Sequence, residues 1–105
     1  MNQQLHTPQP DLQAAEAAMR DVLRDPNSIA APDGASLGRM LGHVVNMQEA
    51  VNSSPDSHAN VAKRLGDFAL TVTRMADRHP DAAPELSRLS ETLLVASKRL
   101  RASLT

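Results

Sequence analysis

Residues 57–79 read SHANVAKRLGDFALTVTRMADRH, and this proline-free segment indicates the class of the whole chain. Apolar side chains recur along it at alternating spacings of four and three residues, as they do along the seam of a helical heptad. The series consists of Val61, Leu65, Phe68, Val72 and Met75, followed by His79. The spacing predicts one straight amphipathic helix that packs along one side, with Leu70 exposed on the opposite side.

The seven prolines of the 105-residue chain divide it into four segments of this kind. Proline lacks a backbone donor, so it is expected between helices or in their first turns. The expected helices cover residues 10–24, 35–52, 57–79 and 82–103, and we find no strand pattern. Because short connections favour antiparallel neighbours, we predict an all-α, up-down-up-down four-helix bundle. The alternative is a three-helix core with a looser first helix, which is the shortest and is rich in alanine.

The length predicts a single domain, residues 10–105, since one core commonly occupies about 100–150 residues. Residues 1–9 are polar and marked by proline, and we expect a disordered tail. Ile29, the only isoleucine, is expected to anchor the connection after the first helix. No apolar run approaches the roughly 20 residues that span a bilayer, so we expect a soluble, cytoplasmic protein without a membrane partner. Nine arginines against two lysines are typical of a bacterial chain from a GC-rich genome.

Composition argues against several classes of function. Eleven basic and twelve acidic residues give a net charge of -1, which is unusual for a nucleic-acid binder. The absence of cysteine excludes disulfides, thiol nucleophiles and thiolate zinc sites. No two of the four histidines (6, 43, 58 and 79) have the four-residue spacing of a helical metal site, and no serine lies in a nucleophile-elbow context. We therefore expect no enzyme, no cofactor, no metal and no small-molecule substrate.

Residues 60–75 resemble the helix-turn-helix pattern of bacterial repressors. The recurring places of that family are occupied here by Ala62, Leu65, Gly66, Val72 and Met75. The resemblance implies a turn at Gly66 and a recognition segment that enters the major groove of DNA. Contacts to DNA would then come from Lys63, Arg64, Thr71, Thr73 and Arg74. The chain departs from the pattern directly after the glycine, at Asp67 and Phe68, and its uninterrupted apolar spacing favours a continuous helix. A DNA-binding regulator is the alternative function.

The helix expected at 35–52 has the broadest apolar arc, about 160° at 100° per residue. Its members are Leu37, Met40, Leu41, Val44, Val45, Met47 and Val51. Two glycines one turn apart border the arc, and small residues at that spacing let another helix come close. We therefore predict a non-enzymatic interaction module that self-associates or binds a partner helix through Gly38, Gly42, Met40, Val45 and Met47. On composition alone, a bacterial secretion-apparatus subunit or chaperone is a further alternative.

Overall fold

The computed structural model describes residues 10–24, 29 and 32–102. Within these residues the chain forms four α-helices, two single 3₁₀ turns and no strand. The elements are α1 (Pro10–Leu23), α2 (Asp33–Ser53), η2 (Pro55–Ser57), α3 (His58–Arg78), η3 (Pro80–Ala82) and α4 (Ala83–Ala102). The prediction of an all-α bundle of four helices is confirmed, whereas the tail expected at 1–9 lies outside the described residues.

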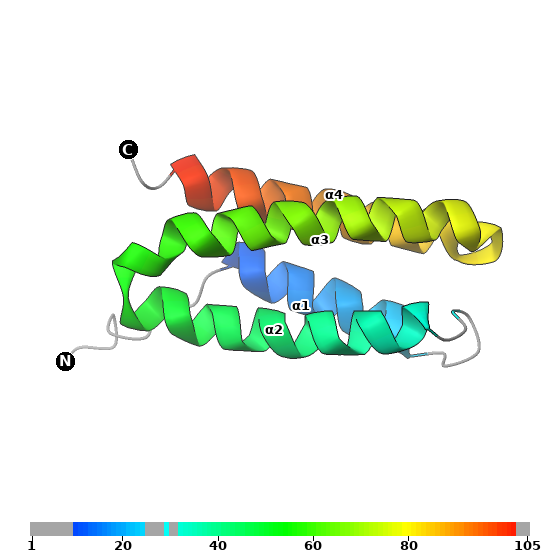
Figure 1. The fold of residues 1–105 in the computed structure, drawn as a ribbon, viewed down its shortest axis with the longest axis horizontal. Coiled ribbons are helices and arrows are strands. Elements are labelled where there is room, and N and C mark those ends of the chain that lie inside the picture. Colours follow the sequence, from blue (N-terminus) through cyan, green and yellow to red (C-terminus); the bar gives the residue numbers. More distant parts are fainter. Residues whose placement is uncertain (1–9, 25–28, 30–31, 103–105) are drawn as a thin grey trace.

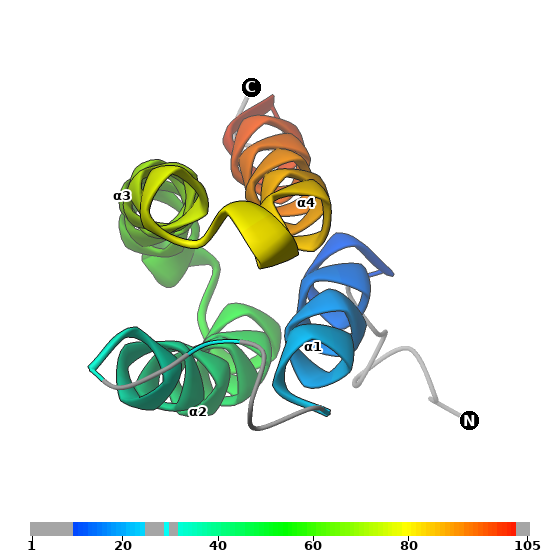
Figure 2. The same cartoon turned by 90° about the vertical axis from the view of Figure 1, so that its right-hand side faces the viewer.

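The four helices lie lengthwise beside one another around one core. Figure 1 shows α1 and α3 running in one direction along the long axis, and α2 and α4 running in the other. The end-on view of Figure 2 places the helices at four corners in chain order, so that α1 also lies next to α4. No described helix has both the length and the apolar character needed to cross a membrane.

Helix α1 is an integral part of the core. Leu12, Ala15 and Met19 are at most 2% exposed. At the edge of the helix, Arg99 of α4 pairs with Asp11 at 3.0 Å. The alternative of a three-helix core with a loosely attached first helix is therefore wrong, because α1 packs on both α2 and α4. Ile29 is also buried, as expected of an anchor for the connection that follows α1.

Helix α3 is continuous through Gly66, but its buried face differs from the heptad seam. Phe68 is only partly buried, whereas Ala62 and Ala69 are buried. Leu70 is 53% exposed, as predicted. The buried face is thus turned toward the side of α3 that carries the small residues, and this is the side on which α4 lies.

The pair α3 and α4 has the most extensive contact in the bundle. The hydroxyl of Ser97 donates to the carbonyl of Ala62 at 2.6 Å, and that of Ser90 donates to the carbonyl of Ala69 at 2.8 Å. A Cβ atom at Gly66 would lie 3.6 Å from the Ser97 Oγ. Small side chains on α3 thus let the two helices come close enough for hydroxyls of α4 to reach the α3 backbone.

The pair α2 and α3 has the least extensive contact of the neighbouring helices. The turn η2 joins the two helices at one end of the bundle, where the Ser57 hydroxyl donates to the Ala50 carbonyl at 3.0 Å. Midway along, the rings of His43 and Phe68 face each other with centroids 6.1 Å apart. This side of the bundle is therefore the most open, although the buried apolar residues of both helices belong to the same core.

Candidate functional site

The structure separates the five residues predicted to form an interaction face on α2. Met40 and Met47 are 8% and 4% exposed and belong to the core. Gly38 and Gly42 are exposed, and Val45 is 41% exposed. At spacings of four and three residues, these last three lie on one side of the helix. We call Gly38, Gly42 and Val45 the outer stripe.

The two glycines leave the exposed side of α2 without side chains, and only Val45 lies beside α1. A Cβ atom placed at Gly38 or Gly42 would meet no atom within 4 Å. Val45 lines a shallow depression together with Glu16 of α1 and Gln48 of α2, and the Gln48 amide donates a hydrogen bond to Glu16. This surface offers backbone and one apolar side chain, so the contact it can make is close van der Waals packing against another helix.

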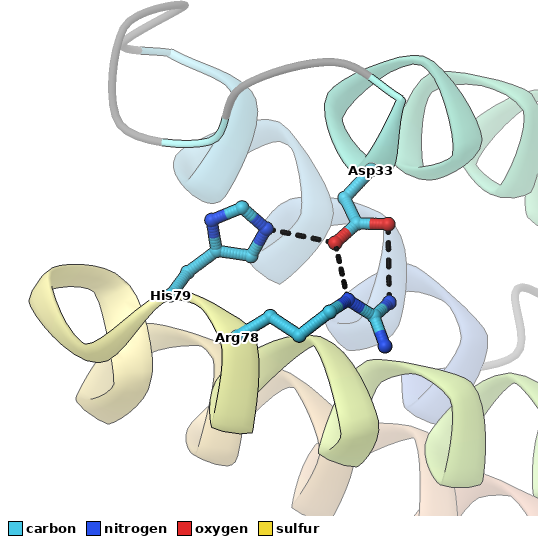
Figure 3. Close-up of polar contacts among 3 residues, drawn as sticks. All are labelled: Asp33, Arg78 and His79. Atoms are coloured by element: carbon cyan, nitrogen blue, oxygen red, sulfur yellow. Dashed lines mark hydrogen bonds and ion pairs between the residues drawn. The ribbon is translucent and has the colours of Figure 1, made fainter.

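A polar cluster lies on the α3 side of α2, at the end of the bundle far from η2 (Figure 3). Asp33 in the first turn of α2 is 8% exposed. The Arg78 guanidinium donates to both of its carboxylate oxygens, from Nε at 3.0 Å and from Nη2 at 3.1 Å. The Nε2 atom of His79 lies 2.7 Å from Asp33 Oδ2. The cluster therefore fastens the start of α2 to the end of α3.

Electrostatics keep Asp33 ionised. The hydrogen bonds from Arg78 and then from His79 hold the pKa of Asp33 below its usual value, against the opposing effect of burial. Asp33 in turn raises the pKa of Arg78. A carboxylate in a first turn also interacts favourably with the positive end of the helix dipole. Both oxygens of Asp33 are occupied by basic partners, so the arrangement is suited to joining two helices.

Sequence reasoning missed this cluster. The sequence pattern places His79 only at the end of the apolar series in 57–79, and it singles out neither Asp33 nor Arg78. The paired residues are 45 and 46 positions apart, and no local spacing connects them. Among the described residues no group of three or more potential ligands is arranged to hold a metal ion.

The residues implied by the helix-turn-helix resemblance lie along one continuous helix, α3. The turn implied at Gly66 is wrong, because α3 continues without a break from His58 to Arg78. The hydroxyls of Thr71 and Thr73 donate to carbonyls four residues earlier in the same helix. Thr73 also contacts Ser90 of α4 at 2.7 Å. The three basic candidates are exposed along α3: Lys63, Arg64 and Arg74.

No protein-family model matches this chain, and no curated protein or solved structure matches it. A fold by itself does not define a function, and helical bundles serve many. The function therefore has to follow from the residues that this fold exposes.

Proposed function

We propose that this chain is a small, non-enzymatic interaction module that binds another helix through the outer stripe of α2. The other helix belongs to a partner protein or to a second copy of the chain. The observation that supports the proposal is the pair of exposed glycines in the interior of α2, with open space where each side chain would begin. Each glycine lowers helix stability by about 1 kcal/mol relative to alanine.

No contact within the described structure offsets the cost of these glycines. Gly34 and Gly66 differ in this respect, because a Cβ atom at either position would lie within 4 Å of a neighbouring atom. An approaching helix would find no Cβ at Gly38 or Gly42, so its backbone would come closer than side chains normally allow. Val45 would then lose its exposure to water, which is favourable for an apolar side chain. Met40 and Met47 support α2 from the core side and are not part of the proposed surface.

The test is to place a large side chain in the outer stripe. Gly38→Leu and Gly42→Leu should each abolish association, because leucine holds the two helices apart. Self-association is measured by light scattering across a concentration series, and binding of a partner by recovery from the native host with identification by mass spectrometry. Ala17→Leu is the matched control, since Ala17 is also exposed but lies on α1. Unchanged mass together with unchanged partner recovery in both glycine variants would contradict the proposal.

A further inference from the structure

The open side of the bundle contains a groove between α2 and α3. It has a volume of about 280 Å³ and lies toward the η2 end. Its floor is apolar, formed by Met47 and Val61, which are 4% and 5% exposed. Its walls are polar or basic: His43, Asn46, Asn60 and Arg64. The groove is on the α3 side of α2, whereas the outer stripe is on its exposed side and reaches α1 only at Val45.

The residues that line the groove include two basic side chains and no carboxylate, and Asp67 follows Arg64 on α3 by one turn. Arg64 and His43 line the groove, and Arg39 precedes His43 by one helical turn. Among the described residues no carboxylate lies within ion-pair distance of Arg39 or Arg64, and Arg39 donates to the Ser36 hydroxyl at 3.1 Å. The buried carboxylate of this flank, Asp33, is already occupied by its two basic partners. This surface is therefore complementary to an anionic partner.

The spacing of the basic side chains follows from the register of α2 and α3. The contacts of Asp33 with Arg78 and of His43 with Phe68 fix the same antiparallel register. In that register Arg64 lies opposite a position one turn beyond His43. At 1.5 Å per residue, Arg39, His43 and Arg64 then follow one another along the seam at intervals of about 6 Å. Acidic residues four apart on another helix would have the same spacing of about 6 Å along its axis, so they would match this basic row.

We propose that this groove binds an acidic amphipathic helix of a partner protein. Its apolar side packs on Met47, Val61 and the partly buried ring of Phe68. Its aspartate or glutamate side chains, spaced by four residues, face the basic row of Arg39, His43 and Arg64. The apolar floor favours a protein helix over a nucleic acid, because a phosphate backbone has no apolar side to bury. The proposal is independent of the outer stripe, because none of its three residues lines the groove.

The experiment uses a designed helical peptide of about 18 residues, long enough to form a helix, with glutamate at every fourth position and leucine on the adjoining face. Amide NMR spectra of the full chain, titrated with this peptide, should show shifts at the groove, notably at Asn46, Asn60 and Val61. Arg39→Glu and Arg64→Glu should each weaken binding about fivefold, since reversal replaces attraction by repulsion. Arg88→Glu, a charge reversal at another exposed position, on α4, should leave binding unchanged.

Further measurements distinguish binding of an acidic helix in the groove from binding at the outer stripe and from binding of a nucleic acid. A peptide with glutamine in place of glutamate should bind more weakly, and added salt should weaken the glutamate peptide selectively. Gly38→Leu should leave peptide binding unchanged, so that failure of the outer stripe and failure of the groove are distinguishable. Absence of peptide binding, or retention of full affinity in both Arg39→Glu and Arg64→Glu, would overturn the proposal. Tighter binding of a thymidine oligonucleotide than of the peptide would overturn it as well.

Discussion

Replacing Gly38 and Gly42 together by alanine tests the outer stripe without introducing a bulky side chain. Neither new Cβ atom would meet a neighbour within 4 Å, so the change adds no steric strain within the chain. Alanine restricts the unfolded backbone and is favoured over glycine in a helix interior by about 0.8–1.0 kcal/mol per site. The free energy of unfolding of the double variant should therefore rise by about 1.5–2 kcal/mol.

The gain is measured by urea denaturation followed by helical circular dichroism, at a dilution where the chain is monomeric. For a domain of this size it corresponds to an increase in Tm of about 6–16 °C. The control is Ala17→Gly in the interior of α1, at an exposed position, which should lose about 1 kcal/mol. The same double variant should associate more weakly, because each added methyl group lies where the other helix must approach.

Two outcomes would refute the reasoning. The first is that Ala17→Gly is destabilised but the double alanine variant is no more stable than the wild type. Alanine would then not be tolerated at Gly38 and Gly42 as it is at an ordinary exposed position in a helix. If the double variant is more stable and associates as well as the wild type, the glycines do not form the contact surface. Higher stability combined with weaker association is the specific signature of glycines retained for binding.

Three further predictions concern the fold. Gly34→Ala should lower the free energy of unfolding by about 1–3 kcal/mol, measured in urea, because its Cβ would lie 2.7 Å from the Ile29 carbonyl oxygen; an unchanged urea midpoint would contradict this. Ser97→Ala should lower the free energy of unfolding by about 0.5–1.5 kcal/mol in the same assay, because the buried hydrogen bond to the Ala62 carbonyl is lost. An unchanged free energy of unfolding would show that this hydrogen bond does not stabilise the fold. The lowered pKa of Asp33 contributes stability that is fully present above the unfolded-state value of about 3.9 and is lost as the pH falls through the folded-state value. Wild type should therefore be more stable than Asp33→Asn at neutral pH and lose this advantage below about pH 4; a pH-independent difference in unfolding free energy would show that the ionised carboxylate is not its source.

The helices and most of the core were predictable because their signals are local. Proline positions and apolar spacing predicted a helix at 35–52, and α2 extends over Asp33–Ser53. Leu86, Leu89 and Leu93 follow one another at helical spacings of three and four within the predicted helix at 82–103, and all three are fully buried. A helix with one buried side has apolar residues at helical spacing along that side, whichever helices cover it.

The partner of each helical face was harder to predict. Small residues spaced by four were interpreted as a point of close helix approach at Gly38 and Gly42, yet within the chain the close approach occurs at Ala62, Gly66 and Ala69. Both stripes satisfy the same rule, and spacing within one helix does not say which helix will face it. Which stripe makes the close approach depends on the side of the bundle where α4 lies. The pattern within α3 carries no information about that side.

The polar cluster and the groove both follow from the sparse packing between α2 and α3. The turn η2 holds these helices together at one end, and Asp33 holds them at the other through Arg78 and His79. An apolar seam along the whole length would bring α2 as close to α3 as α4 is, and it would leave no room above Met47 and Val61. Because α2 and α3 are joined at both ends, their register is fixed. Because they are not closely packed between those ends, the groove stays open. The same arrangement explains why local patterns missed both features, since each requires residues of α2 and α3 to meet across the bundle.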